Sequence, residues 1–129
     1  MQSQATLAAY GACALLLGLS VFPVLLAAGL PLGRFAWGGQ HRVLPRRLRI
    51  GSILAVLTYA GIALVILDAA GVISILPKRL STILVWVTAG YFLLGVGVNL
   101  ISPSLPERIT MTPIALLLCA LSFLVAIGE

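Results

Sequence analysis

Four long apolar stretches, separated by short segments that hold nearly all of the charge, dominate this sequence. They cover about residues 5–30, 50–69, 83–101 and 104–128. A helix needs about 20 predominantly apolar residues to cross a bilayer, so each stretch is long enough to span one. A spanning segment must satisfy its own backbone hydrogen bonds, which favours helices here. The sequence therefore predicts an all-α integral membrane protein, a four-helix transmembrane bundle with short loops that forms one domain over residues 1–129.

The charge content supports this class and excludes others. Charged residues make up 9% of the chain and hydrophobic residues 61%, whereas about a quarter of the residues in soluble domains are charged. Soluble globular, disordered and collagen-like chains are excluded on these grounds. A net charge of +5 would suggest nucleic acid in a soluble protein. Here the basic residues are confined to loops, so we expect no nucleic-acid partner.

The helix of the fourth stretch has two possible N-termini. Ser104 followed by Glu107 reads as a capping box, and Thr112 followed by Pro113 reads as a cap with proline in the first turn. A helix from Pro113 would be only about 24 Å long at the α-helical rise. We therefore favour the earlier start, with Pro113 marking a bend.

The basic residues predict an orientation. Loop 1, residues 31–49, and the loop before the fourth stretch lie on one side, whereas the loop near residue 78 and both termini lie on the other. The first side holds six basic residues and the second holds two: Arg34, Arg42, Arg46, Arg47, Arg49 and Arg108 against Lys78 and Arg79. The positive-inside rule therefore predicts a cytoplasmic loop 1, with both termini outside.

Loop 1 is the main candidate for a surface contact. It reads PLGRFAWGGQHRVLPRRLR, and its arginines can orient the chain while resting on headgroups. The alternative is a docking surface, because arginine binds phosphate through two parallel hydrogen bonds. The candidate contacts for anionic lipid or a partner are Arg34, Trp37, His41, Arg42, Arg46, Arg47 and Arg49.

Small and polar residues at helical spacing predict the faces that pack together. The third stretch has Thr88, Tyr91, Gly95 and Asn99 on one such stripe, and Val85 lies off it. Tyr91 and Asn99 are the candidate intramembrane polar contacts. Glu107 and Arg108 form a candidate loop ion pair, although Glu107 also fits the role of a capping carboxylate. We expect no ionisable group in the bundle interior, which counts against a proton-coupled antiporter.

The remaining chemistry is sparse. Two cysteines and one histidine are too few for a structural zinc site or bis-histidine haem ligation. No catalytic or nucleotide-binding motif is evident, so we expect neither a cofactor nor an enzymatic activity.

Two segments resemble small four-span bacterial membrane proteins of unassigned activity. They are AWGGQHRVLPRRLRIGS at residues 36–52 and NLISPSLPERITMTP at residues 99–113. The resemblance implies a bacterial cytoplasmic (inner) membrane protein and carries no functional residue with it.

Three functional interpretations follow. The first is a non-enzymatic protein that associates with itself, as a homo-oligomer, or with a larger membrane complex. The second is a small oligomeric transporter or channel. The third is a lipid-interacting protein that binds anionic lipid at the cytoplasmic face through the basic loop 31–49.

Overall fold

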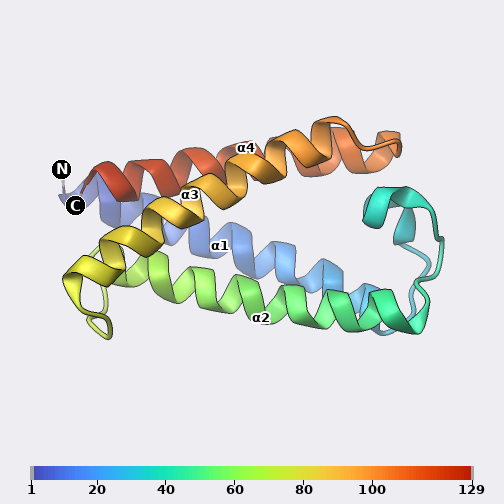
Figure 1. Ribbon diagram of the computed structural model, residues 1–129, viewed down its shortest axis with the longest axis horizontal. Helices are drawn as coiled ribbons and strands as arrows, with labels where there is room; N and C mark the ends of the chain where they lie inside the picture. The colour runs from blue at the N-terminus through green and yellow to red at the C-terminus, as the bar shows by residue number, and fades with distance from the viewer. Residues whose placement is uncertain (1, 129) are drawn as a thin grey trace.

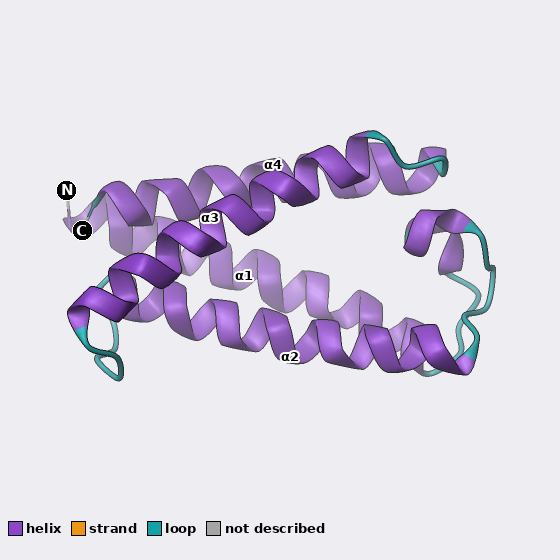
Figure 2. Ribbon diagram, in the orientation of Figure 1, coloured by secondary structure: helices purple, strands orange, loops and turns teal. Residues whose placement is uncertain are grey.

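A computed structural model describes residues 2–128 of the chain. Its four long helices are α1 (Gln2–Ala27), α2 (Arg46–Ala69), α3 (Lys78–Leu100) and α4 (Leu105–Ile127). Two short 3₁₀ turns, η1 (Gly33–Phe35) and η2 (Trp37–Gly39), lie between α1 and α2 (Figure 2). All four long helices are long and apolar enough to cross a membrane. The all-α, multi-pass membrane architecture predicted from the sequence is therefore confirmed.

The helices form two pairs that diverge toward one end of the molecule. α1 packs along α2, and α3 packs along α4. The pairs meet at the end that holds both termini and the α2–α3 loop (Figure 1). At the opposite end they separate, and η1 and η2 lie between them. Loop 1 and the α3–α4 loop therefore share one end, as the alternation of four spans requires.

Helix boundaries follow local signals. α4 begins early, because the Ser104 side chain caps it and accepts a hydrogen bond from the Glu107 N–H at 3.4 Å. Pro113 lies inside this helix, so the earlier start is confirmed. α2 begins at Arg46, directly after an extended Pro45, and α3 begins directly after Pro77. Both start four or five residues before the apolar stretch because a proline sets the preceding backbone and removes a donor.

The buried faces agree only in part with the predicted stripes. On α4, small residues at helical spacing are buried: Ala115, Ser122 and Ala126. On α3 the buried residues are Ser81, Val85, Thr88, Ala89 and Phe92, so Thr88 of the predicted stripe is packed, whereas Tyr91 is 47% exposed. Val85, which the sequence pattern placed off the packed face, is fully buried. These helices are apolar on every side, so hydrophobic periodicity does not choose the face.

The two cysteines lie on different interfaces. The Cys13 Sγ points to the Ala63 carbonyl of α2 at 3.9 Å, and the Cys119 Sγ points to the Ala89 carbonyl of α3 at 3.5 Å. Both are free thiols. Although α1 and α4 pack together, their cysteines do not meet.

Candidate functional site

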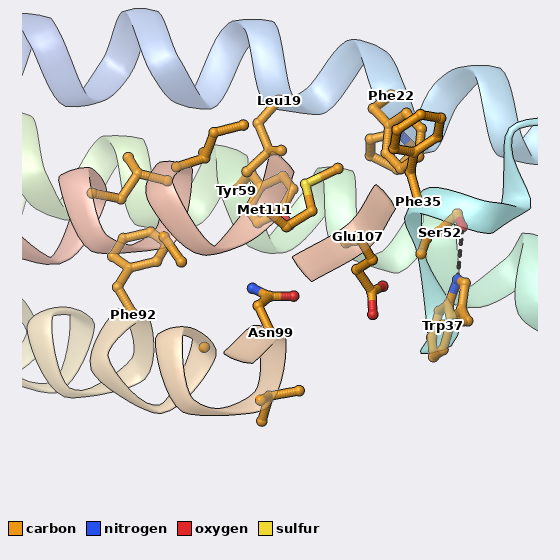
Figure 3. Close-up of a pocket in the computed structure, with 18 of the residues that line it drawn as sticks. Leu19, Phe22, Phe35, Trp37, Ser52, Tyr59, Phe92, Asn99, Glu107 and Met111 are labelled. Atoms are coloured by element: carbon orange, nitrogen blue, oxygen red, sulfur yellow. Dashed lines mark hydrogen bonds between the residues drawn. The ribbon is translucent and has the colours of Figure 1, made fainter. Parts of the chain in front are cut away.

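A cavity of about 380 Å³ lies between the two helix pairs, on the side where they diverge. All four long helices and loop 1 line it. Most of its wall is apolar, and Figure 3 shows Leu19, Phe92 and Met111 on this part of the surface. Glu107, Ser52 and Trp37 lie toward the end that faces loop 1, where Phe22 and Phe35 also lie, and Asn99 lies farther in, at the level of Met111. The cavity is therefore amphipathic, with a long apolar portion and one polar end.

Residues 33–39, which we call the plug, close this polar end from outside. The Trp37 Nε1 donates a hydrogen bond to the Ser52 Oγ of α2 at 3.5 Å. Its ring lies so close to Gly51 that a Cβ there would be 2.8 Å from the Trp37 Cζ2. On the other side, the Ser104 hydroxyl donates to the Arg34 carbonyl. The plug therefore joins the second turn of α2 to the N-cap of α4 across the gap between the pairs.

The plug backbone takes a conformation that its sequence makes possible. Trp37, Gly38 and Gly39 have φ values of 53°, 72° and 73°. Glycine adopts this left-handed region freely, but a bulky residue there stores about 1–3 kcal/mol of strain. Trp37 persists in it because its ring is held by contacts on α2. The WGG run thus turns the chain and directs the indole toward the cavity.

Glu107 is the most unexpected residue of the site, because it lies inside the bundle. Its side chain is only 8% exposed and lines the cavity. The Ser102 hydroxyl donates to the Glu107 Oε1, and the Ser104 N–H donates to the Ser102 Oγ at 3.2 Å. Only half of the capping box therefore forms, since Ser102 intervenes between the carboxylate and the Ser104 N–H. The expectation that the interior holds no ionisable group was wrong.

The side of the cavity between α2 and α3 is its least closely packed side. These two helices make fewer contacts than the other neighbouring pairs of the bundle. The exposed α3 residues Tyr91, Leu94 and Val98 lie on the cavity wall, as do Ala55 and Tyr59 of α2. Because both helices are membrane-spanning segments, this side faces lipid.

The arginines of loop 1 lie away from the cavity, since none lines it. Arg42, Arg46 and Arg47 are exposed. The Arg49 Nε instead donates to the Leu44 carbonyl at 2.9 Å, and the Arg34 guanidinium lies 5.1 Å from the centre of the Phe35 ring.

The other predicted site residues are distributed between the cavity and the loops. Tyr91 and Asn99 both line the cavity. His41 is half-buried, and its Nδ1 has no hydrogen-bond partner within the described part of the chain. Arg108 is exposed while its neighbour Glu107 is buried, and the two form no ion pair. The structure thus brings together Trp37, Asn99 and Glu107, a grouping that the sequence analysis missed.

Comparisons with protein-family models, curated proteins and solved structures give no match to this chain.

Proposed function

We propose that this protein is a non-enzymatic membrane component that takes up an amphiphilic molecule from the bilayer into its inter-helix cavity. The observation that carries the proposal is the cavity itself. It is amphipathic, its least closely packed side faces lipid between α2 and α3, and it holds a buried carboxylate at its closed end. Close packing of the two helix pairs would make the bundle more stable than a cavity does. A purely structural role therefore does not explain the cavity.

The dimensions of the cavity restrict the ligand. Small-molecule sites in proteins usually have volumes of about 300–1,000 Å³, and this one has about 380 Å³. That volume suits a drug-sized amphiphile or one acyl chain better than an entire two-chain phospholipid. The apolar portion would hold the tail, and Asn99 and Glu107 would face the polar head.

The remaining expectations fit within this proposal. Loop 1 would lie at the cytoplasmic face of a bacterial inner membrane, with the exposed Arg42, Arg46 and Arg47 against anionic headgroups. Association with a second copy or with a larger membrane complex would let the protein present the bound molecule to that partner.

Photolabelling tests the proposal directly. The probe is an uncharged long-chain alcohol with a diazirine near the end of its chain, added to the protein in vesicles of neutral lipid. Gly95→Trp fills the cavity, since Gly95 lines it. Gly97→Trp is the matched control two residues further along α3, on another face of the helix, with nothing within 4 Å of its Cβ site.

We expect labelled peptides to come from the cavity wall in the wild type, and Gly95→Trp to remove that labelling. Gly97→Trp should leave it in place. Labelling that is equal in all three proteins, or that is spread evenly over lipid-facing positions, would contradict the proposal.

A further inference from the structure

The charges around the cavity are unbalanced. The Glu107 carboxylate lies on the wall, and no lysine, arginine or histidine is among the lining residues. Within the described chain its hydrogen-bond partner is the neutral Ser102 hydroxyl. A buried carboxylate that lacks a positive partner is costly, because a single neutral hydrogen bond does not replace its lost hydration. The polar end of the cavity therefore favours a positively charged occupant.

Aromatic side chains give a second and independent indication. The chain has four phenylalanines, two tryptophans and three tyrosines. Six of them line this one cavity: Phe22, Phe35, Trp37, Tyr59, Tyr91 and Phe92. The faces of aromatic rings attract cations, and the attraction is larger where water is excluded. An uncharged lipid tail needs only aliphatic packing, so this concentration of rings is better explained by a cation.

We infer that the ligand of the cavity is a lipophilic cation, an ammonium or phosphonium group carried on an alkyl or aromatic body. This inference rests on the proposed function and specifies the class of molecule bound. The cationic centre would lie at the Glu107 carboxylate, with the Asn99 amide beside it, and the apolar body would extend between Phe92 and Leu19. The cation would arrive between α2 and α3 after partitioning into the bilayer.

A matched pair of probes separates charge from shape. Tetraphenylphosphonium and tetraphenylborate have the same form and opposite charge. Binding is followed in detergent by the fluorescence of Trp37, which lines the cavity. The background substitution Trp86→Phe removes the other tryptophan, which lies 44% exposed against Phe123. Each variant is compared with this background for both probes, so differences in detergent partitioning cancel.

Glu107→Gln removes the charge while keeping the size and an acceptor for Ser102. We expect it to weaken phosphonium binding by at least about tenfold, since hydrogen bonds and contacts with a charged partner contribute more than neutral ones. Borate binding should be unchanged or stronger. Glu107→Asp should recover most of the phosphonium affinity.

A second variant keeps the inference testable if Glu107→Gln fails to fold. Ala55→Lys introduces a positive charge at the cavity wall, and Ala55→Met is its uncharged control. The lysine variant should lose phosphonium affinity and gain borate affinity, whereas the methionine variant should treat both probes alike. If Glu107→Gln and Ala55→Lys both leave the phosphonium affinity unchanged, the inference is wrong. In that case cavity labelling by the uncharged alcohol, still lost in Gly95→Trp, would show that the proposed function stands without it.

Discussion

Ser104 shows how much of this structure depends on one side chain. Its hydroxyl accepts from the Glu107 N–H and donates to the Arg34 carbonyl, and its own N–H donates to Ser102. Gly39 packs directly on it: a Cβ at Gly39 would lie 2.5 Å from the Ser104 Cβ. The start of α4, the plug and the orientation of Glu107 are therefore coupled through one residue.

Gly39→Ala should destabilise the protein by more than Gly38→Ala, the change at the neighbouring plug residue. The added Cβ would meet Ser104, and φ is +73°. The left-handed backbone alone costs about 1–2 kcal/mol for a residue with a Cβ, and overpacking adds about 1–3 kcal/mol. Thermal unfolding in detergent, followed by circular dichroism, measures the effect.

Two controls separate the causes at Gly39. Gly38→Ala has a similar φ of +72° but meets only Pro103 atoms at 3.8 Å or beyond, so it should show the backbone cost alone. Gly61→Ala lies inside α2 with nothing within 4 Å and should stabilise slightly. If Gly39→Ala unfolds at the same temperature as Gly38→Ala, the contact with Ser104 is not tight.

At the scale of elements, α2 begins in an unusual way. Its first turn holds Arg46, Arg47 and Arg49 and no acidic residue, although positive charge near a helix N-terminus is unfavourable by about 0.3–1 kcal/mol per residue. Arg49 compensates by bonding the Leu44 carbonyl. Arg46 and Arg47 are exposed, so their compensation would come from outside the chain.

We expect Arg46→Gln with Arg47→Gln to lower the retention of anionic lipid, because each basic residue near an anionic surface contributes about 1 kcal/mol. The matched control is Lys78→Gln with Arg79→Gln, which removes the same charge from the first turn of α3 at the opposite end. Native mass spectrometry counts the retained lipids. An equal loss from both double variants would leave the loop 1 arginines as topology signals alone.

The sequence predicts where the helices lie better than it predicts which side of each helix packs against its neighbours. Prolines, the Ser104 cap and the long apolar runs mark where the helices begin and end, since those signals are local. Which side of α3 packs is not local information: Val85 and Val87 are chemically identical, yet the first is fully buried and the second is 60% exposed. The site is harder still to predict, because Trp37, Asn99 and Glu107 line one cavity from three separate segments. The sequence predicts Glu107 as part of a loop ion pair or as a capping carboxylate, because nothing local to residue 107 indicates that the side chain is buried on a cavity wall.

At the scale of the whole molecule, the divergence of the two helix pairs gives the bundle two different ends. One end is closed by direct helix contacts, including Gly128 against Ala5. The other is closed by the plug and holds the polar part of the cavity (Figure 1). Six of the eight basic residues lie at or near the plugged end, so the polar cavity end should face the cytoplasm.

Cysteine labelling from outside intact cells tests this orientation. Gln40→Cys lies in loop 1 and Ser74→Cys lies in the α2–α3 loop, and both positions are exposed. Cys13 and Cys119 are first replaced by alanine. We expect a membrane-impermeant maleimide to label position 74 and to leave position 40 unlabelled until the cells are opened. The reverse pattern would invert the molecule in the membrane.

The contact between the plug and α4 also affects the order in which the chain can assemble. Arg34 and Ser104 are 70 positions apart, and a ribosome adds about 5–20 residues per second. The plug therefore leaves the ribosome roughly 4–14 s before its partner is made. During that interval α2 and α3 are synthesised, while α4 and Glu107 do not yet exist. Assembly of the bundle is thus completed at its last helix, and a chain interrupted before residue 104 would lack Glu107 and the α4 wall of the cavity.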